Sequence, residues 1–163
     1  MTGQLESLTA YLLGTMPARI HDMFSVESTG GTLVSTRKNL GNGRRRIGVA
    51  RQSIEISWYA YPYRDYPPAM LYALVLAWIE SYANSLFEEL SLPEPTFDVA
   101  LGTEQRGRGD VTVSLELADE LIITEDPKGE IVLDGRRWKL SGPEIWVAEE
   151  ADVGVKIGRT DKD

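Results

Sequence analysis

Residues 53–86, SIEISWYAYPYRDYPPAMLYALVLAWIESYANSL, decide the fold of this chain. Residues 53–61 alternate between apolar and polar side chains, which predicts a half-buried strand. Pro62 ends that strand, since proline has no N–H to give to a sheet. Apolar residues then recur every three or four positions, which predicts a long helix capped by Asp65 and reaching Leu86. The buried face of this unit is predicted to carry Ile54, Ile56, Trp58, Leu74, Val75 and Trp78.

The flanking sequence predicts one more helix and several strands. Residues 4–14 place four leucines at helical spacing. Strict alternation over residues 111–117 predicts the clearest half-buried strand, and Phe97, Val99 and Leu101 predict another. Asp134-Gly135 predicts a tight hairpin turn between residues 130–133 and 136–140. These patterns predict an α+β domain over residues 1–163. One mixed, mainly antiparallel sheet is expected to pack against an N-terminal helix and a long central helix.

Three polar segments are expected to interrupt or flank this core. Residues 32–51 are Gly-containing and basic, which predicts a long mobile loop or a weak hairpin. A short strand beginning near Phe24 is expected to break at residues 28–31, STGG. The C-terminal GRTDKD is expected to be a polar tail.

The composition excludes several classes of protein. The chain has no cysteine, so it has no disulfides, zinc–thiolate sites or thiol nucleophiles. The first residues lack a basic start before a long apolar run, so no secretory signal is expected. The uncharged run 69–79 is too short to cross a bilayer, which needs roughly 20 apolar residues. No membrane partner is therefore expected.

The charge of the chain is unevenly distributed. Residues 37–51 carry six bases and no acid, whereas residues 94–163 carry 17 acids and 9 bases. One basic segment on an acidic body argues against general binding of nucleic acid. It fits self-assembly better, with a positive surface meeting a negative neighbour.

The sequence contains few candidates for catalytic or ligand-binding residues. The single histidine, His21, stands beside Asp22, and adjacent residues do not face each other, so a general base is not expected. Acidic pairs such as Asp119-Glu120 and Glu125-Asp126 are expected to be solvated. Two Gly/Arg segments, 41–46 and 106–109, can bind phosphate through free backbone N–H groups and guanidinium groups, but they match no dinucleotide motif. We predict no catalytic residue, metal ligand or cofactor, and no enzyme activity.

Contact with other proteins is a better explanation than catalysis for the arginines and for the aromatic residues near the end of the predicted strand 53–61. Tyrosine and tryptophan are enriched at interface hot spots, and arginine serves ionic contacts between chains. Alternation places Trp58 in the core and leaves the tyrosines beside it on the other face. The candidate contact residues are Arg44, Arg45, Arg46, Tyr59, Tyr61, Arg106, Arg108 and Trp146.

The order of these elements resembles that of the tail completion, or tail terminator, proteins of contractile-tailed temperate phages of the myovirus type. The resemblance rests on three segments: LTAYLLGTMP at 8–17, LVLAWIES at 74–81, and DVTVSLELADELIITE at 110–125. It extends from about Leu8 to Glu125. The basic segment 37–51 and the residues after Asp126 do not obviously match that pattern.

The resemblance implies a structural virion protein that forms a ring, usually a hexamer. Such a ring caps the head-proximal end of the tail tube, stops polymerisation of tube and sheath, and joins the tail to the head connector. The expected partners are further copies of the chain and the tube, sheath and connector proteins, with DNA only as cargo. The expected location is the virion tail, assembled in the bacterial cytoplasm. The alternatives are another tail-assembly component, such as a head–tail adaptor or a tailocin cap, and a small nucleotide- or anion-binding enzyme.

Overall fold

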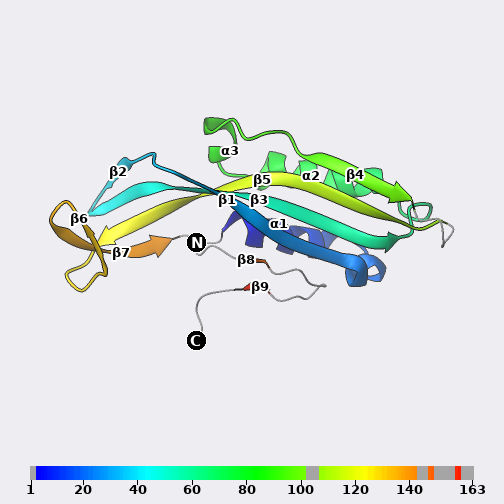
Figure 1. Cartoon of the computed structure of the whole chain (residues 1–163), viewed down its shortest axis with the longest axis horizontal. Coiled ribbons are helices and arrows are strands. Elements are labelled where there is room, and N and C mark those ends of the chain that lie inside the picture. The colour runs from blue at the N-terminus through cyan, green and yellow to red at the C-terminus, as the bar shows by residue number, and fades with distance from the viewer. Residues whose placement is uncertain (1–2, 102–106, 143–146, 149–156, 159–163) are drawn as a thin grey trace.

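The computed structural model describes residues 3–101, 107–142, 147–148 and 157–158 (Figure 1). The chain is α+β, as the sequence predicts. The helices are α1 (Gln4–Thr15), the 3-10 helix η1 (Ala18–Met23), α2 (Pro68–Tyr82) and α3 (Leu86–Glu89). The strands are β1 (Phe24–Val34), β2 (Lys38–Gly41), β3 (Arg44–Tyr61), β4 (Thr96–Leu101), β5 (Gly109–Glu125), β6 (Ile131–Leu133), β7 (Arg136–Gly142), β8 (Val147–Ala148) and β9 (Ile157–Gly158).

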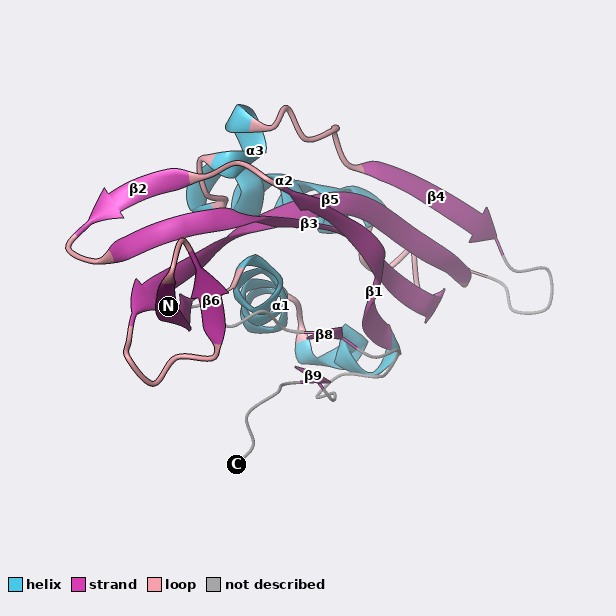
Figure 2. Ribbon diagram, turned by 60° about the vertical axis from the view of Figure 1, so that its left-hand side comes forward, coloured by secondary structure: helices cyan, strands magenta, loops and turns pink. Residues whose placement is uncertain are grey.

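Two long strands, β3 and β5, form the centre of the sheet. They pair from Arg44↔Thr124 to Tyr61↔Gly109. β1 and β2 lie along the other side of β3, while β4 and β7 pair with opposite halves of β5. Every described pair is antiparallel, so the parallel pairing implied by a mixed sheet is absent from this part of the chain. The sheet curls over α1 (Figure 2).

The basic segment is a β-hairpin, so of the two structures predicted for it the hairpin is confirmed and the long mobile loop at 32–51 is wrong. β2 pairs with the start of β3, and Asn42 and Gly43 both have positive φ, as a tight hairpin turn requires. β5 supplies hydrogen-bond partners along the whole of β3, and β1 supplies them from Val49 to Trp58. Pairing with neighbouring strands therefore outweighs the weak polar pattern of the segment itself.

The central helix is shorter than predicted and does not start at Asp65. It begins at Pro68 after an extended Pro67, because each proline disfavours helical backbone in the residue before it. The helix ends at Tyr82. Two residues later, the side-chain amide of Asn84 donates a hydrogen bond to the Ala118 carbonyl of β5.

The main core lies between one face of the sheet and helices α1 and α2. Ile54, Ile56 and Trp58 lie opposite Leu115, Val113 and Val111 of β5, and all six side chains are buried. The predicted core is confirmed, with Leu74 alone half-buried. The indole N–H of Trp78 donates to Ser7 Oγ at 3.0 Å, which ties α2 to α1.

A smaller core lies on the other face of the sheet. Val49 and Ala118 pack there against Leu86 and Leu92, the residues at the start of and just after α3. Ala118 follows Leu117, which belongs to the main core, and neighbouring residues of a strand point to opposite faces. Part of the sheet is therefore covered on both faces.

Candidate assembly surfaces

The bases of the β2–β3 hairpin fall into two groups. Arg46 is 4 % exposed and donates to Glu120 at 2.9 Å, to Glu89 at 3.2 Å and to the Thr36 carbonyl at 2.9 Å. Arg46 therefore joins three segments of its own chain, and its prediction as a contact between subunits is wrong. A buried guanidinium needs such partners, because taking an unpaired charge out of water is costly.

Arg45 also binds within the chain. Its guanidinium pairs with Asp134 at 2.7 Å and lies 4.8 Å from the centre of the Trp138 ring. Farther along β3, Arg51 pairs with Glu116 of β5. These contacts connect the basic hairpin to β5 and to the β6–β7 hairpin.

Arg37, Lys38 and Arg44 form the second group. All three side chains are exposed, and none has an ion-pair partner among the described residues. We call these three residues the basic tip. Of the predicted arginine contacts, Arg44 thus remains available for a partner.

The tyrosines at the end of β3 differ from each other. Tyr59 is 49 % exposed, as predicted, but Tyr61 is fully buried, so its prediction as a surface contact is wrong. The pairing of β3 with β5 shifts between Trp58 and Tyr61, and Ala60 there has φ +53°. This bulge returns Tyr61 to the core face. Burial raises the pKa of its hydroxyl group.

Arg108 supports that bulge. Its guanidinium donates to the Ala60 carbonyl at 3.0 Å, and Asp110 Oδ1 accepts from the Ala60 N–H at 3.0 Å. Arg108 therefore has a role within the chain, although its side chain is exposed. The predicted contacts Arg106 and Trp146 lie outside the described residues.

The Ala60 bulge leads to a stability prediction. A non-glycine residue with left-handed backbone costs about 1 kcal/mol, so Ala60→Gly is expected to stabilise the protein by roughly that amount. Ala50→Gly, at an ordinary position of the same strand, is expected to destabilise it. Urea unfolding of both variants measures the difference. A destabilised Ala60→Gly protein would contradict the assignment of strain to Ala60.

The acidic residues of β5 are less solvated than predicted. Asp119 is 3 % exposed, and its carboxylate accepts a hydrogen bond of 3.0 Å from the Gln4 backbone N–H at the start of α1. Burial raises the pKa of Asp119 to about 6, against the lowering effect of that hydrogen bond. Glu120 pairs with Arg46, and Glu125 pairs with Arg136 at 2.6 Å. Glu120 and Glu125 thus tie β5 to other segments, whereas burial disfavours the ionised form of Asp119.

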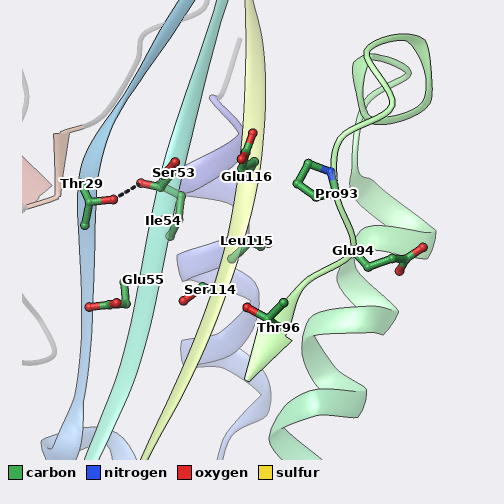
Figure 3. Close-up of a pocket in the computed structure, with 10 residues that line it drawn as sticks. All are labelled: Thr29, Ser53, Ile54, Glu55, Pro93, Glu94, Thr96, Ser114, Leu115 and Glu116. Carbon is green, nitrogen blue, oxygen red and sulfur yellow. Dashed lines mark hydrogen bonds between the residues drawn. The ribbon is translucent and has the colours of Figure 1, made fainter. Parts of the chain in front are cut away.

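The described residues hold no recognisable catalytic geometry. His21 contacts the Met16 carbonyl through Nε2 at 3.0 Å, which is a local contact at the end of α1. A shallow pocket of about 200 Å³ lies on the sheet beside the start of β4, lined by Thr29, Glu55, Glu94, Thr96, Ser114 and Glu116 (Figure 3). Glu116 is already paired with Arg51. Within the described part of the chain, no group of three acidic or histidine side chains is placed to hold a metal ion.

No helix in the described ranges is long and apolar enough to cross a membrane. The features that could serve function in the described residues are on the surface. They are the basic tip at one end of the long sheet, the exposed Tyr59, and exposed apolar residues on β4 and α2. Such surfaces are typical of a component of a larger assembly.

Comparison with known proteins identifies that assembly. The sequence model of the P2 phage tail completion protein R (GpR) matches residues 2–142, and the chain belongs to this family. It therefore has a structural part in phage tail assembly. An uncharacterized 19.2 kDa protein of Haemophilus phage HP1, from the rep-hol intergenic region, is 27% identical over 161 residues, covering 93% of this chain and 90% of the relative. No solved structure matches the chain significantly.

Proposed function

We propose that the chain caps the head-proximal end of a contractile phage tail, stops growth of the tube and sheath, and joins the tail to the head connector. The observation that carries this proposal is the family match over residues 2–142, which takes in both long strands and all the described helices. Completion of a tail requires a protein that binds the end of a polymer without extending it. The same role applies to a prophage-derived tail or a headless tailocin.

The proposed cap is a ring of identical subunits, with a hexamer as the expected size. A ring forms when each subunit binds the next through two different surfaces and the rotation closes. The basic tip supplies one surface of suitable chemistry, on a chain with a net charge of −8. DNA passes through the ring as cargo, and the net negative charge of the chain opposes a tight grip on its phosphates.

The enzyme alternative receives little support from the Gly/Arg segments. In the first, Arg45 and Arg46 are engaged within the chain. In the second, Arg108 binds a backbone carbonyl. An anion would have to displace these contacts, which leaves Arg44 as the one unpaired guanidinium among the described residues of the two segments.

Deletion of the gene from the phage or prophage that encodes this chain tests the proposed function. We expect electron micrographs of induced lysates to show tails of irregular length, without heads, because nothing ends tube growth. Supplying the wild-type chain from a plasmid is expected to restore uniform, joined tails, and an empty plasmid is the control. Tails of normal length that lack heads would favour a head–tail adaptor instead. Tails of normal length that are joined to heads would contradict both the proposed cap and the head–tail adaptor.

A further inference from the structure

The outer side of α2 carries an apolar stripe that the described parts of the chain leave largely uncovered. Ala69, Tyr72, Ala73 and Leu76 are spaced i, i+3, i+4 and i+7, so they lie along one side of the helix. Leu76 is 52 % exposed, and both alanines are exposed. The buried residues Leu71, Val75 and Trp78 occupy the other side. A helix with two apolar sides is expected to be covered on both.

Strand β4 extends this stripe into a wider surface. Phe97, which is 62 % exposed, stacks on Tyr72 with ring centres 4.4 Å apart. Val99, two residues farther along the same face of the strand, is 37 % exposed. We call the stripe of α2 together with Phe97 and Val99 the outer apolar surface.

β4 is also an open edge of the sheet. It pairs with β5 alone among the described strands, and its register from Thr96 to Leu101 has no bulge. By contrast, β1 on the opposite edge is interrupted by a bulge between Ser28 and Gly31. Bulges block pairing between sheet edges, whereas a regular edge strand accepts another strand. β4 is therefore the edge better suited to accept one.

Charge indicates which strand would fit this edge. The sequence from Pro67 to Gln105 contains no lysine, arginine or histidine, and Glu80, Glu94 and Asp98 are all exposed in it. The outer side of strand β2 is unpaired in the described structure. β2 carries Lys38, which forms the basic tip together with Arg37 and Arg44 on either side of the strand. An edge lysine discourages pairing with most strands but suits an acidic partner.

We propose that the β2–β3 hairpin of a second copy docks against β4 and the outer apolar surface. Its β2 backbone extends the sheet beyond β4, and its basic tip meets Glu80, Glu94 and Asp98. β2 and β4 lie toward opposite ends of the long axis (Figure 1). Two such copies therefore join head to tail, and repetition of this contact closes a ring. The inference rests on the proposed ring and specifies the two surfaces that make it.

Exchange of charges tests the ionic part of this contact. Lys38→Glu with Arg44→Glu is expected to shift the protein from the mass of the ring to that of an 18.2 kDa monomer in light scattering. Glu94→Lys with Asp98→Lys is expected to do the same. All four changes in one chain are expected to restore the ring, because each pair again faces the opposite charge. Lys128→Glu, in the turn between β5 and β6, with Lys139→Glu, on β7, is the matched control and is expected to leave the mass unchanged.

Cross-linking tests the proximity of β2 and β4 without relying on charge. The chain has no cysteine, so Asn39→Cys and Ala100→Cys introduce the only thiols. A mixture of the two single variants, treated with a short bis-maleimide, is expected to give a covalent dimer. The double variant is expected to give a ladder up to the ring, and Ala100→Cys alone is expected to give no dimer.

Three results would overturn the inference. They are a ring that survives both charge reversals, efficient cross-linking of Ala100→Cys to itself, which indicates a two-fold contact, and a wild-type chain that stays monomeric. If the charge variants keep the ring but lose tail completion, the outer apolar surface binds another tail protein and not a second copy. The tail-length experiment decides the proposed function separately, so either hypothesis can fail while the other stands.

Discussion

Arg46→Ala is expected to lower the free energy of unfolding by about 2–4 kcal/mol. The substitution leaves Glu89 and Glu120 without their shared cation and the Thr36 carbonyl without its donor, at a position where the arginine is 4 % exposed. The two glutamates are partly exposed, so water relieves some of the loss. We expect a lower urea midpoint with an unchanged slope, as in a loss of stability without a change in exposed surface.

Two matched substitutions separate this role from a simple loss of positive charge. Arg44→Ala, two residues away on the exposed basic tip, is expected to change stability by no more than about 0.5 kcal/mol. Arg46→Lys is expected to fall between the two, because one ammonium group cannot reproduce three contacts made by a planar guanidinium. Equal stability of Arg46→Ala and Arg44→Ala would contradict the assignment of Arg46 to the fold.

Asp119→Asn is expected to stabilise the protein above pH 6. In the folded chain the pKa of Asp119 is about 6, compared with an ordinary value of 3.8. Its ionised form is therefore disfavoured on folding, and its contribution to stability falls as pH rises from about 4 to 6. A shift of this size corresponds to about 3 kcal/mol. Asparagine carries no charge and can still accept the hydrogen bond from the Gln4 N–H.

The measurement is the difference in unfolding free energy between Asp119→Asn and wild type at several pH values. We expect this difference to grow by about 2.5 kcal/mol between pH 4 and pH 7 in favour of the variant. Asp119→Ala serves as the control. Its unfolding free energy is expected to vary with pH as that of Asp119→Asn does, but to be about 1 kcal/mol lower at every pH, because the Gln4 N–H loses its acceptor. A difference that does not vary with pH would show that Asp119 is not held in a low-dielectric site.

Periodicity was sufficient for the elements that form the core. Ile54, Ile56 and Trp58 lie on the predicted face because two-residue alternation over a regular strand leaves no other arrangement. The hairpin at Asp134-Gly135 follows from the turn itself, in which both residues have positive φ. In these segments local pattern and tertiary environment favour the same structure.

Prediction failed where backbone pairing or burial depends on distant residues. Gly30 and Gly31 indicate a break, but they form a bulge within β1, in which a Cβ on Gly31 would lie 2.0 Å from the Arg51 carbonyl oxygen. Alternation assigned Tyr61 to the surface because nothing in the sequence marks the bulge at Ala60. The separation of Arg46 from Arg44 depends on acids 43 and 74 residues away, which a run of arginines cannot reveal.

The length of β3 and β5 has a mechanical consequence. β3 has 18 residues and spans about 60 Å at 3.3 Å per residue, and it pairs with β5 along nearly all of that length. Antiparallel hydrogen bonds lie perpendicular to the strands. A pull along the long axis of the molecule therefore loads the ladder in shear, so that many bonds must break together and not one after another. The chain is built to resist tension in that direction far better than a pull that peels β4 or β7 from the sheet edge.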